Sequence, residues 1–287
     1  MGITKWVFLL LTTTTSLFAQ ASADDRRANT PIGPFKIIQN VYYVGAAEVT
    51  SFLITSPKGH ILIDSGYTET VPQIRANVEK LGFKVEDIKI LLTTQAHMDH
   101  AGGLAELKKL TGARMLSSAA EKPLLANGGK GDFAFGDTLP YEPVMVDRVI
   151  QDGGIIKLGD IRLETIFVPG HTKGSTAWML KTTDAGRKLN VLFFSSTSTP
   201  GYKFLNNAGF PDIVATFENT FARAKTLKPD IFLASHGSAF DLLGKAERRN
   251  STSNPFIESE TYAKYLTETE ASFRQKIADE KAKADPK

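Results

Sequence analysis

Residues 91–103 read LLTTQAHMDHAGG, and the rest of the chain can be interpreted outward from this stretch. An apolar run over residues 88–93 predicts a buried strand, which ends abruptly in polar side chains. His97, Asp99 and His100 are good zinc ligands, and the amide oxygen of Gln95 can serve as a poor one. An ordinary turn does not require this combination. The stretch therefore predicts a metal site at the end of a strand.

The N-terminal residues form a separate region. Lys5 is the only charged side chain before Asp24, and residues 6–11 are a compact apolar run. Small residues around positions 19–23 offer cleavage after residue 21 or residue 23. We therefore interpret residues 1–21 as a signal peptide for export to the periplasm or beyond, in preference to a buried N-terminal helix. Residues 22–36 are then an N-terminal tail, and residues 37–287 a single domain.

Charge and cysteine content exclude several classes of protein. The formal net charge of +3 falls by one if Lys5 is removed, which is too small to argue for nucleic-acid binding. The chain has no cysteine, so it lacks disulfides, thiolate zinc sites, a cysteine nucleophile and a lipoprotein anchor. We expect no membrane anchor in the mature protein, and the sequence indicates no obligate protein partner.

The periodicity of apolar residues predicts strands first and helices later in each half of the chain. Strands are predicted over residues 41–44, 51–55, 60–64, 88–93, 113–117, 144–150, 155–158, 161–168, 175–180, 189–195 and 231–234. Helices are predicted over residues 68–81, 104–110, 119–126, 213–224, 239–248 and 258–281. Residues 127–141 lack periodicity and predict a long loop. Two packed sheets with helices on both outer faces satisfy this pattern.

The five histidines divide into four candidate ligands and one structural residue. His97, His100, His171 and His236 follow apolar strands and lie beside small residues, a placement typical of a site at the mouth of a sheet. His60 begins a strand after a turn, and we expect it to be structural. So many imidazoles favour zinc over iron or manganese. Two clusters of three ligands would leave room for a bridging hydroxide between metals roughly 3.5–4 Å apart.

This pattern resembles the H-x-H-x-D-H signature of the metallo-β-lactamase superfamily. The Gly-His-Thr of residues 170–172 and the Ser-His-Gly of residues 235–237 are similar to its later histidine motifs. The resemblance runs from about Ile37 to the C-terminus. It is greatest to class B β-lactamases of the third subclass, on the strength of residues 170–178 and 196–202. A variant with glutamine in place of the first histidine of the motif occurs in that subclass.

The resemblance implies a fold and a set of metal ligands. The fold would be α+β, a four-layer αββα sandwich. Up to two zinc ions would bind per chain, with Gln95, His97 and His171 at the first position and Asp99, His100 and His236 at the second. Because an amide is neutral and less basic than imidazole, we expect the first position to be the weaker. A degenerate site that holds one metal or none is the alternative.

The resemblance also implies the substrate. Most hydrolases of the superfamily have an aspartate after the strand predicted here over residues 189–195, and other β-lactamase subclasses have a cysteine. The strand here ends in Ser195 and Ser196, and serine is characteristic of the third subclass. We expect Ser196 and Ser198 to bind the carboxylate of a β-lactam, with Tyr202 lining the same pocket. Alternatively, the two serines only cap the strand end.

The expected reaction is hydrolysis of the β-lactam amide bond of penicillins, cephalosporins and carbapenems, which confers antibiotic resistance. Hydroxide from a zinc-bound water would attack the carbonyl carbon, with Asp99 orienting it, and no protein nucleophile is needed. Asp64 is either a partner of a metal ligand or a turn cap. The alternatives are another secreted hydrolase of the same fold, such as a lactonase or phosphodiesterase, and a zinc-binding protein without turnover.

Overall fold

The computed structural model describes residues 27–250 and 252–284, and its first sheet has seven strands in the order β1-β2-β3-β4-β5-β6-β7. The strands are β1 (Phe35–Ile38), β2 (Val41–Tyr43), β3 (Phe52–Ser56), β4 (Gly59–Ile63), β5 (Ile88–Leu92), β6 (Arg114–Ser118) and β7 (Arg148–Ile150). The first four pair antiparallel, and β4 to β7 pair in parallel. The carboxyl ends of β4, β5 and β6 therefore lie at one edge.

The second sheet has five strands in the order β12-β11-β10-β9-β8. They are β8 (Ile155–Leu158), β9 (Ile161–Phe167), β10 (Thr176–Asp184), β11 (Arg187–Phe194) and β12 (Ile231–Ala234). Strands β8 to β11 pair antiparallel, and β11 pairs with β12 in parallel. The ends of β9, β11 and β12 consequently share one edge with the start of β10.

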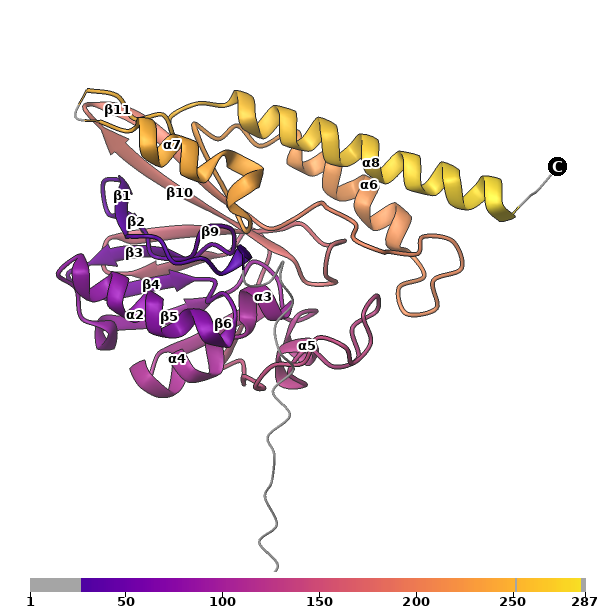
Figure 1. The fold of residues 1–287 in the computed structure, drawn as a ribbon, viewed down its shortest axis with the longest axis horizontal. Coiled ribbons are helices and arrows are strands. Elements are labelled where there is room, and N and C mark those ends of the chain that lie inside the picture. The colour runs from indigo at the N-terminus through magenta and orange to yellow at the C-terminus, as the bar shows by residue number, and fades with distance from the viewer. Residues whose placement is uncertain (1–26, 251, 285–287) are drawn as a thin grey trace, which may run out of the picture.

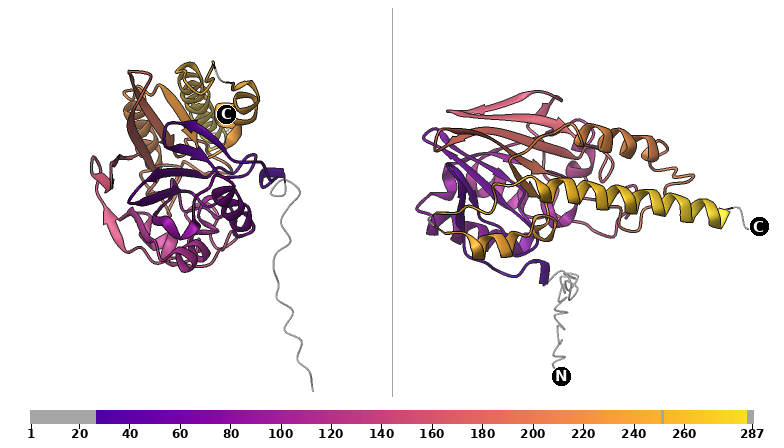
Figure 2. Two further views of the ribbon diagram at one scale, coloured as in Figure 1. Left: turned by 90° about the vertical axis from the view of Figure 1, so that its left-hand side faces the viewer. Right: turned by 90° about the horizontal axis from the view of Figure 1, so that it is seen from above.

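Helices cover the two outer faces, which gives the four-layer αββα arrangement predicted from the sequence (Figures 1 and 2). Helices α2 and α4 pack on the first sheet, and α6, α7 and α8 lie on the side of the second sheet. The helical elements are η1 (Thr68–Thr70), α2 (Val71–Lys80), η2 (Val85–Asp87), α3 (Met98–Ala101), α4 (Leu104–Thr111), α5 (Lys122–Ala126), α6 (Ile213–Ala224), η3 (Gly237–Phe240), α7 (Leu242–Arg248) and α8 (Glu260–Ala284).

The first sheet is apolar on both faces because it packs against both a sheet and helices. In β3, Phe52 and Ile54 belong to the core between the sheets, together with Trp178 of β10. Leu53 points the opposite way and belongs to the cluster that includes Ile74 of α2. A strand buried on both faces needs a continuous apolar run rather than an alternating one, and residues 52–54 of β3 provide it.

Helix bounds differ from the prediction by a few residues, as for α5, which covers only Lys122–Ala126 of the predicted residues 119–126, and three strands differ more. Strand β1 lies partly within the predicted N-terminal tail, and Pro31 already bridges Ala46. The strand predicted over residues 144–150 is shorter, since only residues 148–150 pair with β6. The strand predicted over 175–180 continues to Asp184 in a hairpin with β11, whose outer residues are polar because they are exposed.

Two predictions concern membranes and export. No helix within the described ranges is both long enough and apolar enough to cross a membrane. The predicted signal peptide, residues 1–21, lies outside the described residues.

Candidate metal centre

The candidate ligands meet where the two sheets share an edge. His97, Asp99 and His100 follow β5, His171 follows β9, and His236 follows β12. Backbone hydrogen bonds join the two halves at this edge: for example, Thr176 N donates to Thr94 O at 2.9 Å, and Thr50 N donates to Ser235 O at 3.3 Å. The site is therefore assembled from strand ends that the fold holds in register, rather than from one loop.

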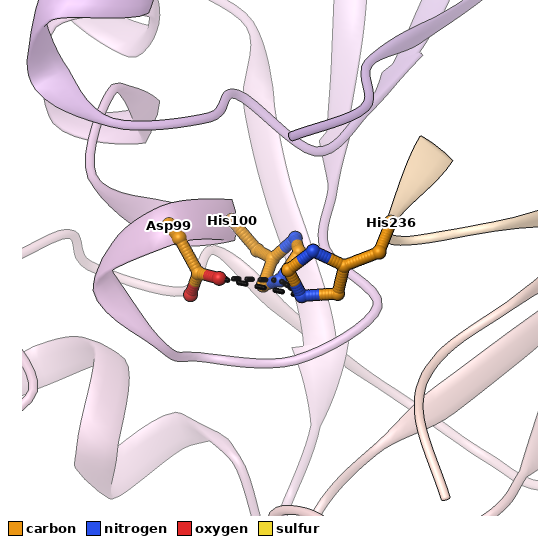
Figure 3. A group of neighbouring side chains, drawn as sticks. All are labelled: Asp99, His100 and His236. Carbon is orange, nitrogen blue, oxygen red and sulfur yellow. Dashed lines mark hydrogen bonds and ion pairs between the residues drawn. The ribbon is translucent and has the colours of Figure 1, made fainter. Parts of the chain in front are cut away.

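The predicted second metal position is formed in the structure by Asp99, His100 and His236 (Figure 3). His100 Nε2 lies 3.1 Å from Asp99 Oδ2 and 3.3 Å from His236 Nε2, and the latter two atoms are 3.4 Å apart. Tetrahedral zinc with bonds of about 2.0–2.1 Å separates neighbouring ligand atoms by roughly 3.3–3.4 Å. Two imidazole nitrogens and one carboxylate oxygen therefore converge with the spacing that such an ion needs.

Each of the two imidazoles of this group has a carboxylate on the side away from Asp99: buried Asp64 for His100 and partly exposed Glu48 for His236. His100 Nδ1 has no hydrogen-bond partner and lies 3.8 Å from Asp64 Oδ2. His236 Nδ1 lies 3.5 Å from Glu48 Oε1, and the carboxylate of Glu48 also accepts hydrogen bonds from the backbone and hydroxyl of Ser238. In both rings the Nε2 atom is thereby left to face Asp99. A carboxylate behind a ligating imidazole is the usual way of fixing its orientation.

Asp64 is held rigidly at the end of β4. Its backbone has φ of 61°, which is unusual for a residue other than glycine. Its carboxylate accepts hydrogen bonds from Thr93 Oγ1, Thr94 N and Thr94 Oγ1 at 2.9, 2.7 and 2.7 Å. Complete burial raises the pKa of Asp64 above its ordinary value, with His100 and these donors opposing the shift. Asp64 therefore combines the two expected roles, since it caps the Thr93–Thr94 turn and faces His100.

Electrostatics keep Asp99 ionised. Burial would raise its pKa, but the nearby imidazoles of His100, His236 and His97 outweigh burial and hold the pKa far below the ordinary range. The pKa of Glu48 is likewise lowered, because hydrogen bonds from His236 and Ser238 outweigh burial. The centre thus gathers imidazole nitrogens around a fixed negative charge, which suits a divalent cation.

The predicted first position brings His97 and His171 together, with ring centroids 4.8 Å apart. His171 Nδ1 donates to the carbonyl oxygen of Ser198 at 2.8 Å, which leaves Nε2 as the available ligand atom. His97 Nε2 is buried and lies 3.4 Å from Asp132 Oδ2. The other oxygen of Asp132 accepts hydrogen bonds from Ala134 N and Phe135 N, so the loop over residues 127–141 fixes this carboxylate against His97.

Gln95 has a different contact. Its side chain is buried, and its amide oxygen accepts a hydrogen bond from Ser195 Oγ at 2.9 Å. Ser195 occupies one of the two lone pairs of that oxygen. A metal at the first position would have to share the oxygen with this hydroxyl. This contact supports the prediction that the two metal positions are unequal.

Of the predicted substrate-binding residues, Ser196 and Ser198 line a cavity of about 250 Å³ and Tyr202 does not. The other polar residues that line this cavity are Ser235, His236, Ser238 and Tyr265. Tyr202 is buried beside His171 instead, and its hydroxyl donates to the His171 carbonyl oxygen at 2.6 Å. The structure thus places Tyr202 as a support of His171 rather than in this hydroxyl-lined cavity.

Glu48, Asp132 and Tyr265 contribute to the site although no sequence motif predicts them, and His60 lies apart from the ligands, as predicted. Asp132 is in the loop singled out for its length. His60 is buried and packs edge to face on Phe83 with centroids 5.1 Å apart, a structural role. The predicted donor set of one carboxylate, one amide and four imidazoles fits a metal of the zinc type.

Comparison with known proteins places this site in a family. A model of the metallo-beta-lactamase superfamily matches residues 44–236. The probable metallo-hydrolase YqgX of Bacillus subtilis is 30% identical over 220 residues, which are 75% of this chain and 94% of that protein. Hydroxyacylglutathione hydrolase GloC of Haemophilus influenzae is 28% identical over 193 residues, 64% of this chain and 84% of that protein.

Two solved structures are more similar in sequence to this chain than the two hydrolases above. A metallo-beta-lactamase of Cronobacter sakazakii described by its HARLDQ motif superimposes with a TM-score of 0.86 at 40% identity, covering 91% of this chain and 100% of that one. BJP-1, a subclass B3 metallo-beta-lactamase of Bradyrhizobium japonicum, superimposes with a TM-score of 0.86 at 33% identity, covering 91% and 99%. Together with the αββα layers and the clustered ligands, these matches show that the chain belongs to the metallo-beta-lactamase superfamily of hydrolases.

Proposed function

We propose that this protein is a zinc-dependent β-lactamase that hydrolyses the amide bond of penicillins, cephalosporins and carbapenems. The observation that carries the proposal is the cavity lined by hydroxyl groups beside His236, described above. Because His236 is a predicted metal ligand, a carboxylate bound by these hydroxyls would place the rest of a β-lactam next to the metal centre. The similarity to solved β-lactamases supports the same substrate class. Export, proposed from residues 1–21, would place the enzyme in the periplasm or outside the cell.

In this proposal some residues bind the metals and others hold the metal-binding side chains in place. Zinc bound at the two positions would lower the pKa of a coordinated water and polarise the substrate carbonyl. Asp99 supplies the negative charge shared by the imidazoles of His100 and His236. Asp64, Glu48 and Asp132 hold the rings in place from behind. Because these groups are already oriented, little reorganisation is needed when charge develops in the reaction.

Hydrogen-bond donors in the cavity match a carboxylate. Ser196 Oγ accepts from Ser198 N and donates to Ser198 Oγ, so the hydroxyl proton of Ser198 is left free for a ligand. Tyr265 OH accepts from Thr197 N at 3.0 Å and lies 3.5 Å from Ser196 Oγ, so its own proton points to that oxygen until a ligand replaces this long contact. Two hydroxyl donors that can turn to a ligand in one small cavity favour a ligand with two acceptor oxygens.

Replacing Ser198 by alanine is therefore expected to raise KM for benzylpenicillin by about 10-fold, since a hydrogen bond to a charged group contributes about 1.5–3 kcal/mol and water replaces part of it. We expect kcat to change little, because the carboxylate does not react. The methyl ester of benzylpenicillin provides the control: its KM should be the same for the two proteins. An equal rise for the acid and the ester would contradict a carboxylate contact.

The decisive experiment measures imipenem and nitrocefin hydrolysis by purified protein, with zinc titrated in and then removed by EDTA. We expect hydrolysis that EDTA abolishes and zinc restores. S-lactoylglutathione, an acyl-homoserine lactone and a phosphodiester should be run in parallel. Turnover of any of these with none of the β-lactams would overturn the substrate while keeping the metallo-hydrolase. Zinc binding without turnover of any substrate would indicate a binding protein.

A further inference from the structure

Glu121 is a buried acid that the proposed chemistry does not use. It directly precedes α5 and is 2% exposed. Its carboxylate contacts two segments that are distant in the sequence: the loop after β5, which carries Gln95 and His97, and the loop after β9, which carries His171. These three residues are the predicted ligands of the first metal position.

Three donors from the two loops converge on this carboxylate. Oε1 accepts from Ala96 N, which lies between Gln95 and His97, and from Thr172 Oγ1 at 2.7 Å. Oε2 accepts from Gly174 N at 2.8 Å. Because every partner is a donor, an ionised carboxylate satisfies all of them without a proton of its own. Burial raises the pKa of Glu121 above its ordinary value, and these donors and His97 oppose that shift.

The backbone around Glu121 also interlocks with the His171 loop. A Cβ atom at Gly174 would lie 2.4 Å from Glu121 N and 2.4 Å from Ser118 Oγ, so the approach requires glycine. Ser118 Oγ donates to Gly174 O at 3.0 Å and accepts from Glu121 N at 3.2 Å. The backbone N–H and C=O of Gly174 are thus both hydrogen-bonded to residues 118–121.

We propose that Glu121 is a positioning residue that sets the separation of the Gln95–His97 loop and the His171 loop, and so determines the affinity of the first metal position. The proposal rests on the predicted ligand set of that position and is independent of which substrate is hydrolysed. None of the three donors belongs to a ligand of the second position. The effect of Glu121 should therefore be selective for one of the two metals.

The variant Glu121→Gln tests the proposal by replacing one carboxylate oxygen with an NH₂ group. A glutamine oxygen can still accept from Ala96 N and Thr172 Oγ1, but its NH₂ group would face Gly174 N, donor against donor. We expect the first-position affinity for Zn²⁺ to fall by about 10-fold, in the range found for residues that support metal ligands. Affinity at the second position should be unchanged. Competition with a chelating dye, using the full-length purified protein, measures both.

A second readout is the visible spectrum of the Co²⁺-substituted protein, which reports the number and geometry of the metal ligands. In E121Q we expect only the bands of the first position to change. Glu121→Asp keeps the charge but is one methylene shorter, and we expect it to behave like E121Q. If E121D instead binds Zn²⁺ at the first position as tightly as the wild-type protein, the charge of residue 121 determines this affinity and the spacing of the two loops does not. That result would overturn the positioning role.

Two further variants separate positioning from general stability. Thr172→Val removes one of the three donors without a change of shape, and we expect a smaller loss at the first position. Asn254→Asp is the matched control, because it makes an isosteric amide-to-carboxylate exchange at a side chain that donates to Ile37 O, on β1. It should lower the thermal midpoint and leave both metal affinities unchanged. Equal weakening of both positions in E121Q and T172V, or no weakening in either, would refute the proposal.

Discussion

The variant Asp99→Asn is expected to lose the metal of the second position and to lower kcat/KM for imipenem by more than about 100-fold. Residues that only orient a ligand typically contribute 10–100-fold to metal affinity or activity, and Asp99 contacts the ion directly in our proposal. Its Oδ2 atom is within 3.4 Å of both His100 Nε2 and His236 Nε2. Asparagine keeps the shape but removes the negative charge that the two imidazoles share.

Metal analysis after dialysis tests this expectation independently of the substrate. The wild-type protein should retain the second-position ion, and D99N should release it. Asp160→Asn is the control, because it removes one carboxylate in an exposed turn between β8 and β9 and should change neither metal content nor turnover. A D99N protein that keeps a tightly held second ion would refute the ligand assignment, whatever the substrate proves to be.

Local patterns explain which parts of the fold were predictable. The bounds of α6 and β12 agree with the prediction because apolar spacing and burial coincide there: Ile213, Phe217 and Phe221 all face the core. Strand β1 was missed because it is four residues long and follows a polar, proline-containing segment. Such a strand is stabilised by pairing with β2, which is a tertiary property that a short window of sequence does not contain.

The metal ligands were predictable because they lie in motifs, whereas their supports do not. His97, Asp99 and His100 fall within four residues, and such spacing is visible in any sequence. Glu121, in contrast, meets Thr172 across 51 residues, and Glu48 meets Ser238 across 190. A lone acid in a loop is usually a solvated side chain, so only the fold distinguishes these two carboxylates from the other acids of the chain.

Replacing Gln95 by histidine is the second large effect that we expect. It would restore the H-x-H-x-D-H signature and exchange a neutral amide oxygen for an imidazole nitrogen, which zinc prefers. We predict that the first-position affinity for Zn²⁺ rises at least about 10-fold, a difference of about 1.4 kcal/mol. Dialysed wild-type protein should then contain about one zinc per chain and Q95H about two, a stoichiometry that follows from the unequal donor sets.

The contact between Gln95 and Ser195 allows a sharper test of the cause. If the hydroxyl of Ser195 competes for the amide oxygen, Ser195→Ala should raise first-position affinity when residue 95 is glutamine. Ser195→Ala should not raise the first-position affinity in Q95H, because histidine lacks the amide oxygen to which Ser195 donates. A double-mutant cycle of the two substitutions isolates this coupling. Two equally tight zinc ions in the wild-type protein would contradict unequal positions, and additive effects in the cycle would show that Ser195 does not limit Gln95 as a ligand.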